Sequence, residues 1–182
     1  MRNKFLEDFI REAKPSEELI NKYTMKIPEL LLEIWKQYGF GNTLNGYLKI
    51  VNPDLFQAIL KNVYVRNESA IVLFVTSMGD FIVWEDNKYL ILLNFRRGRI
   101  KGISSGFKFF FSDLEDEAFY QDTLDWLPYP EAVGKLGKPK YDECFGYVPI
   151  LGLGGLEKVE NLSKVKLIEH IYLINQLMGT IK

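Results

Sequence analysis

The sequence has very little cysteine and histidine, two residue types that often build metal sites and nucleophilic active sites. One cysteine and one histidine occur in 182 residues, which excludes an internal disulfide bond and a cysteine-based zinc cluster. No apolar run approaches the roughly 18 residues that a membrane-spanning helix needs. The amino-terminal segment also lacks the apolar core of a signal peptide. These absences indicate a cytoplasmic protein that needs no membrane, metal or cofactor.

An excess of either charge is missing as well. Lysine and arginine number 23 against 24 acidic residues, which gives a formal net charge of −1. This balance argues against direct binding to nucleic acid, because nucleic-acid-binding domains are usually strongly basic. Apolar side chains are abundant by contrast, since 47% of the residues are hydrophobic and 14% are aromatic. Such a composition favours a folded domain with a packed interior.

Helical periodicity is prominent in the first third of the chain. Apolar residues from Phe5 to Ile10 predict a short helix that ends near Pro15, and Ser16 can start a second helix. A third helix is predicted to start at Pro28 and to end at Gly39. The following segments are predicted to be a loop, a strand and a helix, at residues 41–46, 47–51 and 52–63.

The middle of the chain changes to β-rich runs separated by short turns. The turns contain Met78-Gly79, Asp86-Asn87 and Arg97-Gly98, and connections this short join antiparallel strands. We therefore expect an α+β fold, in which an antiparallel β-meander is flanked by N-terminal and C-terminal helices in one compact unit. The predicted strands cover residues 70–76, 80–85, 89–96 and 99–103, and the closing helix covers residues 167–178.

Two adjacent segments differ sharply in charge. Residues 94–108 contain five basic residues and no acid, whereas residues 112–134 contain seven acidic residues and no base. Aromatic residues alternate with the acids of the second segment, so one or two short helices are expected there. Such a segment is either a solvated outer face or an acidic surface that meets a basic partner.

Residues 141–155 combine an acidic pair, the cysteine and four glycines, and they fit neither helical nor strand periodicity. One hypothesis is a small hydrolase in which Cys144 and His170 form a nucleophile–base pair oriented by Asp142 or Glu143. Against it, a nearby carboxylate raises the pKa of a thiol, and a small buried cysteine is the alternative. The glycines lack the GK[ST] ending of a phosphate-binding loop. A further hypothesis is a ligand-sensing regulatory domain whose pocket lies under the glycine-rich segment.

Several of these pieces occur together in one known family. The runs IPELLLEIWKQYGFG, LNGYLKIVNPDLF and GDFIVWED resemble the GAD-like domain of bacterial proteins. The runs DECFGYVPILGLGG and LSKVKLIEHIYLINQLMG resemble the domain that follows it in the immunity protein for a type VI secretion DNase effector. The resemblance implies a GAD-like part at residues 1–109 and an immunity-protein part at residues 110–182, which share one core. It also implies an α+β fold similar to that of SUKH-type immunity proteins.

The function that the resemblance implies is not enzymatic. An immunity protein binds its cognate toxin in the cytoplasm and neutralises it by direct contact. Turn, cap and core residue types dominate the family motifs, so we expect them to be scaffold rather than contact residues. These motif residues are Trp35, Gly39, Asn52, Pro53, Gly79, Asp80, Trp84, Asp142, Glu143, Gly146, Pro149, Gly154 and Gly155.

The acidic segment is the predicted toxin-facing surface. A nuclease carries a positive surface to approach phosphates, and an inhibitor gains association rate by presenting the opposite charge. Aromatic residues at positions 119, 120 and 126 can supply apolar anchors. The predicted contact residues are Asp113, Glu115, Asp116, Glu117, Asp122 and Asp125.

Overall fold

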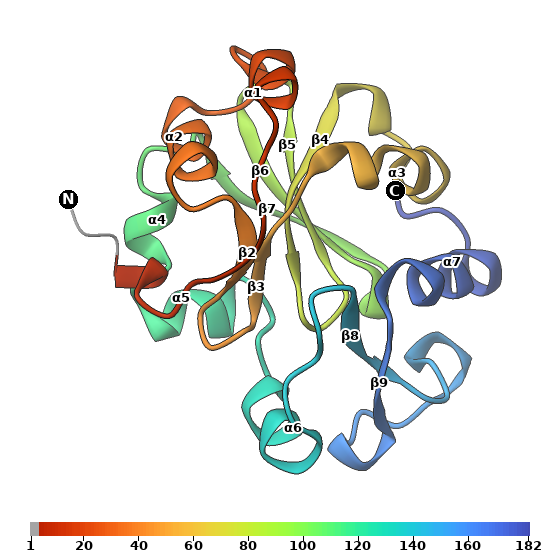
Figure 1. Cartoon of the computed structure of the whole chain (residues 1–182). Helices are drawn as coiled ribbons and strands as arrows, with labels where there is room; N and C mark the ends of the chain where they lie inside the picture. The colour runs from red at the N-terminus through yellow and green to blue at the C-terminus, as the bar shows by residue number, and fades with distance from the viewer. Residues whose placement is uncertain (1–3) are drawn as a thin grey trace.

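A large antiparallel sheet forms the centre of the molecule. The computed structural model describes residues 4–182, and each strand of this sheet pairs with its neighbours in the sequence (Figure 1). The α+β meander predicted from the sequence is confirmed. The strands are β1 (Ile10–Ala13), β2 (Phe40–Thr43), β3 (Leu48–Ile50), β4 (Ala70–Thr76), β5 (Phe81–Glu85), β6 (Tyr89–Asn94) and β7 (Arg99–Ser105). A separate two-stranded sheet pairs β8 (Glu143–Tyr147) with β9 (Leu162–Lys166).

The helices begin and end largely where the local chemistry predicts. The Ser16 hydroxyl accepts a hydrogen bond from the Leu19 amide, and the Asn52 side chain accepts one from Asp54. Gly39 ends the second helix in the left-handed region, with φ of +87°. Within residues 4–182, no helix is long and apolar enough to cross a membrane. The helices are α1 (Glu17–Tyr23), α2 (Glu29–Gln37), α3 (Gln57–Val63), α4 (Phe110–Asp113), α5 (Glu117–Asp122), α6 (Tyr129–Leu136) and α7 (Leu167–Met178).

The first edge of the sheet differs from the prediction. The helix expected from Phe5 to Ile10 is instead a single 3-10 turn (Lys4–Leu6) followed by strand β1, and the loop expected at residues 41–46 contains part of β2. The physical reason is a close backbone approach. A Cβ atom added to Gly41 would lie 2.1 Å from the carbonyl oxygen of Ile10, so only glycine lets β1 lie against β2.

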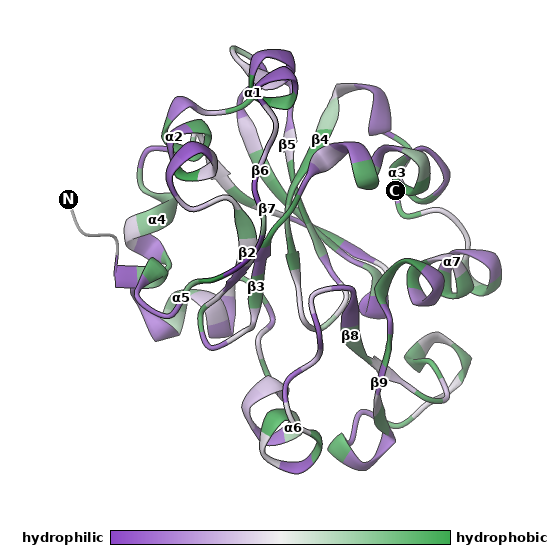
Figure 2. Cartoon of the chain, in the orientation of Figure 1, coloured by the Kyte–Doolittle hydropathy of each residue, from purple (hydrophilic) through white to green (hydrophobic). Residues whose placement is uncertain are grey.

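Both faces of the large sheet are covered, which makes a three-layer arrangement. Helices α1, α2, α4 and α5 lie on one side, and α3 and α7 lie on the other (Figure 1). Ile82 and Trp84 face the first set of helices, whereas Phe81 and Val83 face the second. Apolar residues therefore run continuously along the central strands (Figure 2), because both sides need them. Trp84 and Trp35 are both buried, as predicted.

A buried lysine ties the early strands to the later part of the chain. Lys49 in β3 is fully buried, and its Nζ donates hydrogen bonds to the carbonyl oxygens of Lys140 (2.7 Å), Tyr141 (3.0 Å) and Glu143. Burial lowers the pKa of Lys49 to about 8. This pKa is still above neutral pH, so the ammonium group remains charged there. Both hydrophobic clusters contain residues from before and after position 109. The division at that position stays a prediction.

Candidate functional site

The cysteine predicted as a possible nucleophile is buried inside the protein. Cys144 has no exposed surface, and a Cβ atom added to Gly79 would lie 3.2 Å from its Sγ. Burial raises the pKa of the Cys144 thiol to about 12, although the nearby Lys49 ammonium acts in the opposite direction. Because the thiolate is the reactive form, this environment suits a packing residue rather than a nucleophile.

The other groups of the hydrolase hypothesis do not complete an active site around the cysteine. No hydrogen bond joins Cys144 to His170 within residues 4–182, and His170 packs instead against Gly146. Asp142 forms an ion pair with Lys166, and Glu143 accepts a hydrogen bond from the Lys140 amide at 3.0 Å. In the described part of the chain, no group of three or more metal-ligating residues could hold a metal ion.

Native Cys144 is therefore expected to resist thiol reagents. At pH 7 to 9 the intact protein should show no rapid labelling, because the thiol is both inaccessible and un-ionised. The same reagent should label the protein at once after denaturation in urea. Mass spectrometry of both samples checks this, and rapid stoichiometric labelling of the native protein would contradict it.

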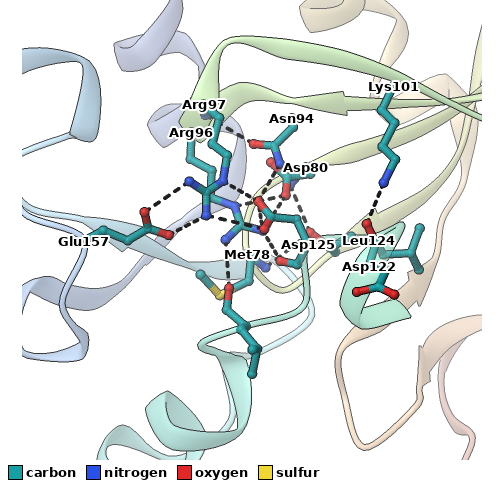
Figure 3. A network of polar contacts seen from close by, with 12 residues as sticks. Met78, Asp80, Asn94, Arg96, Arg97, Lys101, Asp122, Leu124, Asp125 and Glu157 are labelled. Carbon is teal, nitrogen blue, oxygen red and sulfur yellow. Dashed lines mark hydrogen bonds and ion pairs between the residues drawn. The ribbon is translucent and has the colours of Figure 1, made fainter. Parts of the chain in front are cut away.

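A partly buried ion-pair network lies where the basic and acidic segments meet (Figure 3). Asp80 precedes β5 and is fully buried, and its Oδ2 accepts hydrogen bonds from Arg96 Nε at 3.2 Å and Nη2 at 3.1 Å. Arg96 and Arg97 occupy the 3-10 turn η4 (Phe95–Arg97) between β6 and β7. Asp125 Oδ2 lies 3.3 Å from Arg96 Nη2 and 2.6 Å from Arg97 Nε. Arg97 also forms an ion pair with Glu157.

The electrostatics of this network differ between its two aspartates. Burial raises the pKa of Asp80 to about 6, and the Arg96 charge opposes that rise. Burial acts to raise the pKa of Asp125 as well, but the hydrogen bond from Arg97 and the charge of Arg96 outweigh it and hold the pKa below its usual value. Sequence reasoning placed Asp80 in the scaffold but missed its arginine partner. The available signal was the pair of adjacent segments with opposite charge.

The predicted partner-binding acids fall into two groups. Four of them are exposed around α5 and are called the acidic surface here: Glu115, Asp116, Glu117 and Asp122. Asp113 and Asp125 are half-buried, and the Asp125 carboxylate forms ion pairs with Arg96 and Arg97. Asp116 also caps α5, because its side chain accepts a hydrogen bond from the Ala118 amide at 2.9 Å. Phe119, Tyr120 and Trp126 are half-buried beneath this surface and pack against the core.

The glycine-rich segment borders a cavity of about 380 Å³. The cavity lies where this segment, the end of β8, helix α7 and the turn between β6 and β7 come together. Arg97 and Glu157 line it, so the cavity adjoins the ion-pair network. Sequence reasoning proposed a pocket in this place but identified neither Tyr147 nor the arginines that line it.

Comparisons with known proteins agree with this architecture. Residues 2–95 match the family model of the GAD-like domain, and residues 104–178 match that of the T6SS immunity protein Tdi1, C-terminal. No curated protein matches the sequence significantly. The crystal structure of Atu4351 from Agrobacterium tumefaciens has the same fold, with a TM-score of 0.78 and 18% sequence identity over 96% of this chain and 88% of that chain. The chain therefore belongs to the GAD-like domain family, and it carries after that domain the C-terminal domain of the T6SS immunity protein Tdi1 family.

Proposed function

We propose that the protein binds a cognate toxic effector, a DNase delivered by type VI secretion, and neutralises it by direct contact in the cytoplasm. The match of residues 104–178 to the C-terminal domain of an immunity protein carries this proposal. The burial of Cys144 supports a binding role, because it leaves the alternative hydrolase without an accessible nucleophile. Co-purification with the toxic domain of a type VI secretion DNase effector, taken from a neighbouring gene where one encodes it, tests the proposal, and failure to form a complex would overturn it.

The acidic surface around α5 is the proposed contact region for the toxin. Its four carboxylates are exposed, and a nuclease must present positive charge to bind phosphates. Opposite charges on two partners raise the association rate and suppress binding to wrong partners. Asp125 takes no direct part in this contact, because Arg96 and Arg97 already hold its carboxylate. Its role is to fix the loop that follows α5 against the sheet.

Charge reversal at Glu117 and Asp122 is expected to slow association with the toxic domain about 10-fold to 100-fold at low salt. The dependence of the rate on salt should weaken at the same time. Both residues are exposed, and Asp116 is left intact because its loss would remove the cap of α5. Stopped-flow measurements with a catalytically inactive toxic domain, at two salt concentrations, give both quantities.

A matched control uses the first residues of two other helices. Glu17 and Glu29 are exposed and begin α1 and α2, as Glu117 begins α5. Their double reversal to lysine changes the net charge by the same amount but should leave the association rate close to that of the wild type. Equal rates for both double variants would show that the contact lies on another face, even where the complex still forms.

A further inference from the structure

Strand β7 forms an open edge of the large sheet. It pairs with β6 on one side and is the last strand in the order of the sheet. Every residue from Arg99 to Ser105 is exposed or half-buried, whereas β5 is completely buried. Apart from the pairing with β6, no hydrogen bond from elsewhere in residues 4–182 reaches the backbone of β7. In an edge strand, alternate residues direct their N–H and C=O groups away from the sheet, so this edge can pair with a further strand.

The open edge of β7 is positively charged. It belongs to the basic segment, which contains no acid between residues 94 and 108. Arg96 and Arg97 of that segment are engaged in the ion-pair network. By contrast, Arg99 and Lys101 are exposed, and neither forms an ion pair within residues 4–182. Their side chains leave the same face of the strand, because they are two residues apart. The charge of this edge is therefore available to a partner.

The middle of this edge is both held in place and uncovered. Lys101 Nζ donates a hydrogen bond to the main-chain carbonyl of Asp122 at 2.5 Å (Figure 3), which leaves the ammonium group two further N–H donors and its full charge. Beside it, a Cβ atom added to Gly102 would find no atom within 4 Å. A bulge at Ile103 interrupts the pairing with β6. The regular part of the edge, on which a strand can be added in register, is therefore Arg99–Gly102.

We propose that β7 binds an acidic, extended segment of a partner protein by strand addition. The backbone of that segment hydrogen-bonds to the outward groups of Arg99–Gly102, and acidic side chains at alternate positions meet Arg99 and Lys101. A second copy of this chain is a poor occupant, because two paired β7 strands bring the same positive charges together. The opposite edge is less suited to an acidic segment, since β1 carries Arg11 beside Glu12. This site is separate from the acidic surface and does not depend on the proposed function.

A fluorescent peptide in which glutamate alternates with threonine tests the site. We expect saturable binding to the full chain at low salt, with a dissociation constant below about 100 μM. Hydrogen exchange of the β7 amides should slow in the complex, because the added strand supplies the missing acceptors. Arg99→Gln breaks no internal hydrogen bond and should weaken binding about 3-fold, and Arg99→Gln with Lys101→Gln should weaken it about 10-fold. A single-stranded oligonucleotide of similar charge should leave exchange in β7 unchanged, since it has no peptide backbone to pair with the strand.

Two matched controls separate strand addition from attraction between charges. A peptide with proline in place of threonine keeps its charge but loses half of its N–H donors, so it should bind at least about 10-fold more weakly. Lys14→Gln with Lys26→Gln removes the same charge from exposed positions and should leave binding unchanged. The proposal is overturned if the wild type shows no saturable binding at about 100 μM peptide, or if the two peptides bind equally. Slowed exchange in β1 instead of β7, or a free chain that sediments as a dimer with its β7 amides already protected, would also overturn it.

Discussion

Replacing Arg96 by methionine is expected to reduce the free energy of unfolding at neutral pH by about 3–5 kcal/mol, because the change leaves the buried Asp80 carboxylate without its cation. Asp80 is fully buried, and both of its hydrogen bonds from side chains come from Arg96. Methionine keeps most of the aliphatic stem, so the loss reflects charge more than packing. Urea denaturation of the wild type and the variant gives the difference.

The cost of Arg96→Met should also depend on pH. Burial already raises the pKa of Asp80 to about 6 in the wild type, and loss of the guanidinium raises it further. A carboxyl group with a raised pKa in the folded state favours folding at low pH and loses that contribution as the pH rises through the folded pKa. The variant should therefore lose less stability at pH 5 than at pH 8.

Arg97→Met is the matched control for this prediction. Arg97 is partly exposed and also pairs with Asp125, so its replacement should cost only about 1 kcal/mol. Equal costs for the two variants, or a cost of Arg96→Met that does not change with pH, would contradict the assignment of Asp80 as the buried charge that needs compensation.

Trp35→Ala is expected to destabilise the protein by about 3–5 kcal/mol, since it opens a large cavity in a packed interior. The Trp35 side chain is fully buried and makes edge contacts with Tyr23 and Phe40, at ring-centroid distances of 5.7 Å and 5.1 Å. Trp35→Phe should cost much less, because the indole N–H has no hydrogen-bond partner in the described chain. Urea denaturation measures both, and a similar cost for the two changes would show that the N–H matters more than the ring volume.

The β-meander could be predicted because its turns are determined locally. The short connections from β4 to β5, from β5 to β6 and from β6 to β7 each contain residues with positive φ, namely Gly79, Asp86, Asn87 and Gly98. These residue types tolerate that conformation. The strands between them bury apolar residues on both faces, so the pattern was visible in a continuous sequence window. The closing helix and the caps at Ser16 and Asn52 were predictable for the same reason.

The first edge of the sheet could not be predicted in this way. Strand β1 pairs with β2, which lies about thirty residues later, and Ile10 aligns with Asn42. The apolar residues near the start have helical spacing in the sequence, but they do not share one face in the structure. Phe5 and Leu6 are buried in the core, whereas Ile10 is exposed on the edge strand. Only the long-range contact at Gly41 decides between the two structures.

The candidate sites were predictable in composition but not in pairing. The sequence shows a basic segment beside an acidic one, yet nothing local indicates that Arg96 pairs with Asp80 and Asp125 while Asp122 stays exposed. The unpaired hydroxyl of Tyr147 is equally invisible in the sequence, because burial and the lack of a partner both depend on the complete fold.

The hydrogen bonds of Lys49 have a consequence for the way this protein can be divided or recombined. Lys49 lies in the segment that matches the GAD-like domain, whereas its three carbonyl acceptors lie in the segment that matches the immunity-protein domain. A fragment that ends between the two segments would keep a lysine built for burial and lose every acceptor. The two segments are therefore expected to unfold as a single cooperative unit. A chimera of two family members should fold well only if position 49 and the backbone at residues 140–143 come from the same parent.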